Sequence, residues 1–143
     1  MTAFLDSSAL VKRYADEPGS DLVQAVSEPV IASDLASVEV PAALWRKHRI
    51  GQLSAADAQL LCRRFLADMS PASATSGAGF IEVGNDILSS AIELVARHPL
   101  RAYDAVQLAS AIAVTRIVGS CRFGCFDQQL NDAAVVEGLI LLW

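Results

Sequence analysis

Four acidic residues stand where neighbouring strands and helices would bring their side chains together. Asp6 closes the first apolar run, Glu39 lies early in a predicted helix, Asp104 lies in a largely apolar helical segment, and Asp127 follows a strand-like run. Two carboxylates about 5 Å apart repel by about 3 kcal/mol at an effective dielectric of about 20, so four converge cheaply only if a cation joins them. Mg²⁺ or Mn²⁺ is the expected cation, because hard divalent metals prefer carboxylate and water oxygens.

Each acid also has a purely structural interpretation. Asp6 could cap the next helix, although the two serines after it could do so without burying a charge. Glu39 could be a surface acid attracted to the positive end of its helix, and Asp127 could simply cap the last helix. Asp104 leaves less room for such an interpretation, because an unpaired aspartate among apolar neighbours is expensive.

The elements that must position these acids alternate between strand and helix. Strands are predicted at residues 2–5, 29–32, 80–83, 122–126 and 139–142, and helices at 7–17, 20–26, 35–49, 54–68, 85–97, 101–118 and 127–137, with a loop at 70–79. This alternation predicts an α/β fold, in which a parallel sheet lies between helical layers. Ligands bind such sheets beyond the carboxyl ends of the strands, where Asp6 and Asp127 fall.

Length and composition favour one domain over residues 1–143. The chain is 53% hydrophobic and 19% charged, so disorder is not expected, and no apolar run reaches the roughly 18 residues that a membrane helix needs. Without a signal-like start, we expect a cytoplasmic protein with no membrane contact. The net charge of −5 argues against a general nucleic-acid coat, but not against an enzyme that holds RNA through metal ions and local basic patches such as Lys12-Arg13 and residues 46–49.

The three cysteines predict neither a disulfide framework nor a zinc site. Cys62, Cys121 and Cys125 give an odd count, and no histidine or further cysteine lies near the last two in the sequence. Free cysteine usually packs as a small apolar residue, so we expect buried free thiols.

Four segments together resemble the PIN-domain family and, within it, the VapC toxins of bacterial toxin–antitoxin pairs. They are Phe4-Leu5-Asp6-Ser7-Ser8-Ala9-Leu10-Val11-Lys12, Glu39 in the third predicted helix, Tyr103-Asp104-Ala105-Val106-Gln107-Leu108-Ala109, and Phe126-Asp127-Gln128-Gln129-Leu130. The resemblance spans nearly the whole chain in order, spacing and length. It implies a three-layer α/β/α PIN-like domain with a central parallel sheet. It also implies a metal-dependent endoribonuclease toxin that forms a homodimer and is silenced by a small VapB-like antitoxin. We expect this antitoxin to place Arg or Lys near the four acids and to cover the surface around Val11 and Trp45 with apolar residues.

Within this resemblance, Asp6 and Asp104 are expected as the principal Mg²⁺ ligands. Glu39 and Asp127 would complete the catalytic acidic pocket, directly or through waters, and Ser7 would hydrogen-bond a carboxylate or the RNA phosphate. Many relatives carry Ser or Thr two residues before the fourth acid, where this chain has Cys125. A thiol replaces a hydroxyl poorly near a hard metal, which puts any role of that position beside the metal in doubt.

Two other functions fit the same sequence less well. A phosphatase with an aspartyl nucleophile would usually carry a second Asp two residues after the first, where this chain has Ser8. A non-catalytic PIN-fold binding module would be favoured by loss of an acid, yet all four acids are present.

Overall fold

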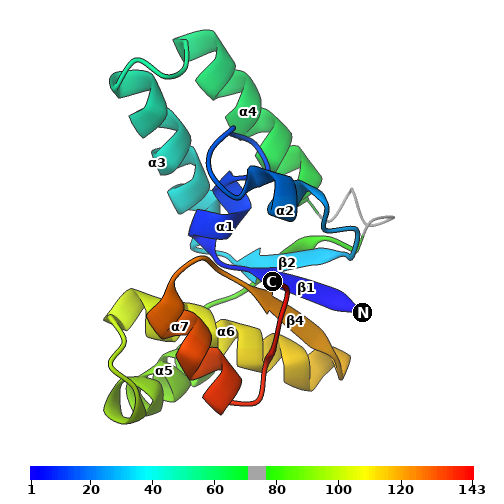
Figure 1. Cartoon of the computed structure of the whole chain (residues 1–143), viewed down its shortest axis with the longest axis vertical. Helices are drawn as coiled ribbons and strands as arrows, with labels where there is room; N and C mark the ends of the chain where they lie inside the picture. The colour runs from blue at the N-terminus through cyan, green and yellow to red at the C-terminus, as the bar shows by residue number, and fades with distance from the viewer. Residues whose placement is uncertain (71–76) are drawn as a thin grey trace.

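A five-stranded parallel sheet forms the centre of the molecule in the computed structural model, which describes residues 1–70 and 77–143 (Figure 1). The strands are β1 (Thr2–Leu5), β2 (Val30–Ser33), β3 (Gly79–Ile81), β4 (Cys121–Gly124) and β5 (Ile140–Leu141), in the spatial order β3-β2-β1-β4-β5. The central strand β1 pairs with β2 through Ala3 opposite Val30, and with β4 through Leu5 opposite Gly124. The predicted parallel sheet is therefore confirmed.

Helices cover both faces of this sheet and make the three-layer α/β/α arrangement. One layer contains α1 (Ser7–Val11), α2 (Ser20–Gln24), α3 (Ala36–Arg49) and α4 (Ala55–Asp68); the other contains α5 (Asn85–Arg97), α6 (Ala102–Val118) and α7 (Gln128–Val136). In Figure 1, α3 and α4 form a hairpin that projects above the sheet, and α5, α6 and α7 lie below it.

Two apolar cores explain why β1 has no polar face. Phe4 packs with the core beneath α5, α6 and α7, whereas Ala3 and Leu5 pack with the core beneath α1, α3 and α4. Side chains alternate between the two faces of a strand, so a central strand covered on both sides needs apolar residues throughout.

Two predicted helix starts or ends were wrong for identifiable reasons. The helix after β1 was predicted to run to residue 17 but ends at Val11, because the main-chain N–H groups of the next three residues bond three residues back and form tight turns. The third predicted helix was expected to begin at residue 35, but α3 begins at Ala36 without a side-chain cap. Ser33 accepts from the nearby Leu35 N–H, whereas Asp34 Oδ1 accepts from Val83 N, which ties the segment after β2 to the segment after β3.

The remaining predicted elements agree with the structure to within two residues at each end, and α5 agrees at both ends. Most of the predicted loop at 70–79 lies outside the described residues. Among the described residues, no helix is both long enough and apolar enough to cross a membrane.

Candidate active site

The four acids predicted from the sequence gather at the carboxyl edge of the sheet. Asp6 follows β1 directly and Asp127 follows β4, the neighbouring parallel strand. Glu39 and Asp104 lie in the first turns of α3 and α6. Their charges act on one another: Asp104 and Glu39 both raise the pKa of Asp6, and Asp127 and Glu39 both raise the pKa of Asp104.

Asp6 is the buried member of the group, with only 6% of its surface exposed. Burial raises its pKa to about 6 from the usual 3.8, against two opposing hydrogen bonds. Its Oδ1 accepts the Ala9 N–H at 2.8 Å, and the Ser8 hydroxyl donates to both carboxylate oxygens at 3.0 and 3.1 Å. The ionised carboxylate is therefore costly in this place unless a positive charge joins it.

Asp6 itself caps α1, which corrects the expectation that a serine would do so. An aspartate in extended conformation just before a helix accepts an N–H of the first turn, and this leaves the Ser8 hydroxyl free to donate. Ser7, which was expected to contact a carboxylate or phosphate, is buried, and its Oγ lies 3.3 Å from both Tyr103 Oη and Gln107 Nε2. Ser8 is thus the serine that hydrogen-bonds the Asp6 carboxylate. A substrate role for Ser7 stays a prediction.

A polar network behind the acids was not identified from the sequence. Burial raises the pKa of the Tyr103 hydroxyl, and the nearby Glu39 carboxylate adds to this. The buried Gln107 donates to Tyr103 Oη at 2.8 Å, while its Oε1 has no hydrogen-bond partner among the described residues. The network places the Tyr103 hydroxyl beside Glu39 and joins α6 to α1 through Ser7.

Asp104 is only partly buried and lies one residue after Tyr103. Burial is the main reason why its pKa is raised, the Asp127 charge adds to it, and the nearby Arg101 opposes it. Asp104 therefore meets its strongest repulsion from the neighbouring strand–helix connection, which supports its place in the same cluster as Asp127.

Asp127 is exposed and caps α7 by accepting the Leu130 N–H at 2.9 Å. Two residues earlier, Cys125 is buried, and its thiol lies 3.0 Å from Asn131 Oδ1. Burial and the nearby charges of Asp6, Asp127 and Asp104 raise the pKa of this thiol to about 12, so it stays neutral. The thiol thus serves the packing of α7 in this structure, and Cys121 and Cys62 are free as well, although Cys62 is only partly buried.

The donor set fits a hard divalent cation by its chemistry, because it consists of carboxylate oxygens that repel one another. Among the described residues, no three His, Cys, Asp or Glu side chains are grouped closely enough to hold a metal ion. The structure thus brings the four acids into one charged cluster without a ready-made coordination sphere.

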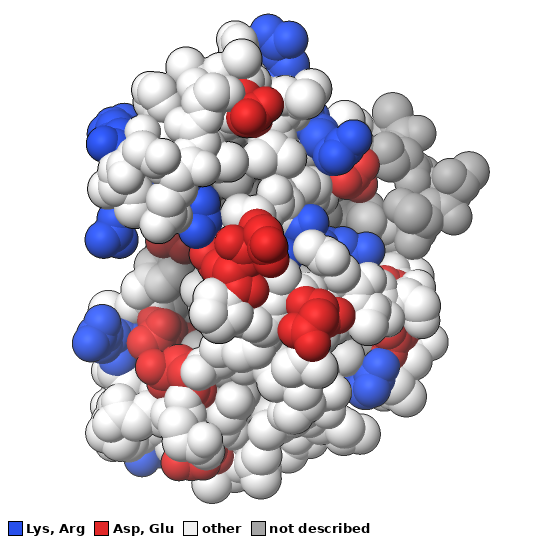
Figure 2. All heavy atoms as spheres, turned by 45° about the horizontal axis from the view of Figure 1, so that its top comes forward, with Lys and Arg blue, Asp and Glu red and all other residues white. Residues whose placement is uncertain are grey.

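A groove of about 770 Å³ adjoins this cluster. It contains residues of α1, of α3 and of the β4–α7 connection: Ser8, Val11, Lys12, Glu17, Ala42, Ala43, Arg46, Lys47, Ile50, Gln52, Phe126 and Asp127. Charge of both signs is also mixed over the wider surface, where Figure 2 shows Asp and Glu atoms gathered in the middle of one face with Lys and Arg atoms beside them. The net charge of −5 is therefore not a uniform acidic coat.

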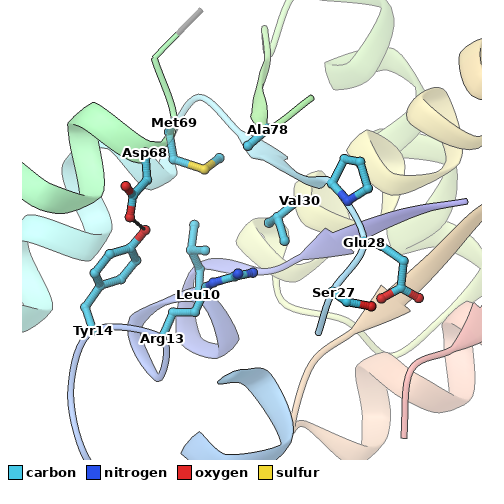
Figure 3. Close-up of a pocket in the computed structure, with 10 residues that line it drawn as sticks. Leu10, Arg13, Tyr14, Ser27, Glu28, Val30, Asp68, Met69 and Ala78 are labelled. Atoms are coloured by element: carbon cyan, nitrogen blue, oxygen red, sulfur yellow. Dashed lines mark hydrogen bonds between the residues drawn. The ribbon is translucent and has the colours of Figure 1, made fainter. Parts of the chain in front are cut away.

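A second cavity of about 690 Å³ lies at the start of β2, away from the acids (Figure 3). There Tyr14 donates to Asp68 at 2.8 Å across its rim, and Arg13 extends toward its interior. Val30 and Met69 supply apolar walls. Since the predicted site acids are absent from its lining, this cavity is separate from the candidate active site.

Comparison with known proteins identifies similar sequences and similar folds. No profile of a known protein family matches the chain. Two curated relatives from Mycobacterium tuberculosis, ribonuclease VapC45 (strain CDC 1551 / Oshkosh) and ribonuclease VapC49 (strain ATCC 25618 / H37Rv), are each 35% identical to this chain over 117 residues, which cover 78% of this chain and 75% of the relative.

Two solved structures share the fold at low sequence identity. The crystal structure of VapC20 from M. tuberculosis, a toxin that cleaves the sarcin-ricin loop, has a TM-score of 0.63 at 18% identity and covers 96% of both chains. PAE2754 from Pyrobaculum aerophilum has a TM-score of 0.60 at 21% identity and covers 99% of this chain and 92% of the other. At these identities the structures support the architecture alone.

Proposed function

The chain belongs to the VapC family of ribonucleases, and from this premise we propose that it is a metal-dependent endoribonuclease, the toxin of a toxin–antitoxin pair. The observation that carries the proposal is the gathering of Asp6, Glu39, Asp104 and Asp127 at one edge of the sheet, where burial and the charges of the other acids raise the pKa values of Asp6 and Asp104. A protein keeps repelling carboxylates together at a cost, and a bound divalent cation offsets that cost. The reaction proposed is hydrolysis of RNA phosphodiesters in the cytoplasm.

Each acid has a distinct place in this proposal. Asp6 and Asp104 would hold Mg²⁺ or Mn²⁺, and Glu39 and Asp127 would complete the pocket directly or through waters. Such a cation supplies an acidified water for attack on phosphorus and positive charge against the charge that develops on the phosphate. The Ala9 N–H and the Ser8 hydroxyl fix the Asp6 carboxylate, and the Tyr103 hydroxyl lies near Glu39, where it would orient that carboxylate.

The test is incubation of the purified protein with total RNA, in Mg²⁺ or Mn²⁺ and in EDTA. We expect cleavage only with the metal, and Asp6→Asn or Asp104→Asn to lower the rate by orders of magnitude while circular dichroism stays unchanged. Asp16→Asn is the matched control, because Asp16 is an exposed aspartate outside the cluster. Undiminished cleavage by either site variant would remove the assignment.

We also propose that a small VapB-like antitoxin silences the enzyme by placing Arg or Lys near the four acids. Guanidinium pairs with carboxylates in a bidentate way, so such a residue would displace the metal or block RNA. The antitoxin's apolar residues were expected to cover a surface around Val11 and Trp45, but Val11 is only 5% exposed. The exposed apolar side chains of α3 and its C-terminal end are instead Val38 and Ile50, at 70% and 60%. Co-expression with the neighbouring small gene, followed by Ala substitution of its basic tail residues, tests this; full inhibition without those residues would contradict pocket neutralisation.

We propose that the active form is a homodimer. Leu88, Ile92 and Val95 lie on one side of α5 and are 45%, 69% and 42% exposed, which is unusual for large apolar side chains at helical spacing. A second copy of this chain would cover them. Light scattering of wild type and Ile92→Glu tests the contact: we expect a dimer that the substitution dissociates, and a wild-type monomer at every concentration would exclude it.

A further inference from the structure

The chain contains only two lysines, and both end on the same carboxylate in the groove beside the acids. Lys12 Nζ lies 3.0 Å from Glu17 Oε1, and Lys47 Nζ lies 2.7 Å from Glu17 Oε2. The lysine side chains are only 15% and 16% exposed, whereas lysine is rarely buried to this extent unless it is paired. The ammonium groups of Lys12 and Lys47 are thus both held against one carboxylate, that of Glu17.

Aromatic packing fixes one of these ammonium groups. Lys12 Nζ lies 4.9 Å from the centre of the Phe126 ring, at a distance typical of a cation–π contact. Phe126 stacks on Trp143 at 4.8 Å, and the indole N–H of Trp143 donates to the Cys125 carbonyl at 3.0 Å. Gly19 (φ +91°) lies so close to the ring that a Cβ there would meet it at 2.7 Å. The ring cannot turn aside without disturbing these contacts, so the ammonium is preorganised.

The lysine pair shares its groove with one of the four acids, Asp127, and the groove adjoins the other three. Its lining includes Ser8, whose hydroxyl donates to Asp6, and Asp127, which directly follows Phe126 in the chain. Arg46, one residue before Lys47, adds a third positive charge to the same groove. Single-stranded RNA whose backbone reaches the acids along this groove therefore passes the two lysines.

We propose that Lys12 and Lys47 bind one phosphate of the RNA backbone next to the cleavage site, in the place that the Glu17 carboxylate fills when RNA is absent. This rests on the proposed ribonuclease function. A phosphate offers several oxygens to two ammonium groups, as the carboxylate does, and carries its charge at the same point. Glu17 keeps the lysines in place before RNA binds and competes with the phosphate for them.

The alternative is that Glu17 only links the α1–α2 segment to α3. This structural role predicts a different effect of substituting Glu17 on RNA affinity. If Glu17 only ties the segments together, Glu17→Gln weakens the tie and leaves RNA affinity unchanged or lower. If Glu17 competes with phosphate, the same substitution removes the competitor and RNA binds more tightly. Glutamine has nearly the same shape, so the two roles separate at this residue.

The experiment measures binding of a fluorescein-labelled oligouridylate of about 12 nucleotides, a length suited to one single-strand groove. All variants carry Asp6→Asn so that RNA is not cut, and fluorescence anisotropy is recorded over a range of salt concentrations. We expect Lys12→Met and Lys47→Met each to weaken binding by about tenfold, as loss of a charged hydrogen bond does. In the double variant, the slope of log affinity against log salt should fall in magnitude by about 0.7, the value for one neutralised phosphate of a single strand.

Matched variants separate a specific phosphate contact from general charge. Lys12→Arg should keep most of the affinity, and Glu17→Gln should increase it by about threefold or more, since a competing charge is removed. Arg116→Met, at the far end of α6 and about 18 Å along the helix from Asp104, should change little. Wild-type-like binding by the lysine double variant, or an unchanged or lower affinity of Glu17→Gln, would overturn the phosphate site.

Three further results keep the proposals distinguishable. If the otherwise unmodified protein cuts RNA but the lysine variants bind RNA normally, the phosphate site is wrong and the ribonuclease function stands. If the lysine variants lose only antitoxin binding, the pair recognises an acidic protein segment, and the RNA assignment is overturned. If the protein with all its acids neither cuts nor binds RNA, the proposed function itself fails.

Discussion

Replacing Asp6 with asparagine should make the metal-free protein more stable at neutral pH while removing its activity. The Asp6 carboxyl has a pKa of about 6 in the folded protein and 3.8 in its usual state. The native state thus holds the proton more tightly than the unfolded state. Protonation of Asp6 therefore stabilises the folded protein fully below about pH 3.8, and this stabilisation is lost as the pH rises through about 6. Above that pH, the ionised carboxylate costs about 3 kcal/mol of folding free energy.

Asparagine avoids that cost and keeps the shape of the side chain. Its Oδ1 can accept the Ala9 N–H that Asp6 accepts at 2.8 Å, so α1 keeps its cap. The partly exposed contact with Ser8 is changed, at a cost of about 1 kcal/mol. At about pH 7.5 in EDTA, Asp6→Asn should therefore raise the free energy of unfolding by about 2 kcal/mol, which is about 6 °C in melting temperature for a chain of this size.

Urea unfolding followed by the fluorescence of Trp45 and Trp143 measures this difference. The advantage of the variant should shrink toward zero as the pH is lowered to about 4, where Asp6 is protonated in both states. Asp16→Asn, at an exposed position, should show no such pH-dependent gain. An Asp6→Asn variant that is less stable than wild type at neutral pH, or a difference that does not vary with pH, would refute the reasoning that the carboxylate is destabilised by its burial.

Three further predictions concern the metal, the network and the packing of β4. Mg²⁺ or Mn²⁺ at about 100 times its dissociation constant should raise unfolding free energy by about 2.7 kcal/mol in calorimetry, and much less in the Asp6→Asn, Asp104→Asn double variant; equal gains would place the metal elsewhere. Tyr103→Phe removes the hydroxyl beside Glu39 and should slow RNA cleavage by about tenfold with unchanged circular dichroism, whereas a wild-type rate would show that Glu39 needs no positioning by this hydroxyl. Gly124→Ala would place a Cβ 2.7 Å from two leucine side chains and should lower the stability to urea by about 1–3 kcal/mol; a neutral effect would mean that the core relaxes around it.

The strands and the acid at the end of β1 were predictable because burial on both faces leaves a plain signal. Val30–Ser33 and Thr2–Leu5 are short and largely apolar, and only a central strand of a parallel sheet requires this. A carboxylate directly after such a strand has no apolar role, so Asp6 was identified from its position. Its catalytic role, like that of the other three acids, remains a prediction that cleavage assays must test.

The contacts between distant side chains were not predictable from the sequence. Glu17 carries no local signal that separates it from an ordinary surface acid, yet it binds Lys12 and Lys47, because α1 packs beside α3. Lys47 is thirty positions away, and neither residue carries a local pattern that indicates the other. Their pairing depends on tertiary packing, which short-range periodicity does not encode.

The polar network behind Glu39 was missed although a weak signal exists. Tyr103 and Gln107 are four positions apart in a helix of mostly apolar residues, so they share one face. Such a pair indicates a buried hydrogen bond, but not its partner. Ser7 lies on another helix, and only the packed structure brings its hydroxyl to the pair.

The place of β1 at the centre of the sheet determines when this enzyme can first act during its synthesis. Leu5 is made long before its partner Gly124. The four acids cannot meet until Asp127 has emerged and β4 has paired with β1, and such long-range pairing is slow to form. A nascent chain that has not yet reached Asp127 therefore cannot assemble the acidic cluster.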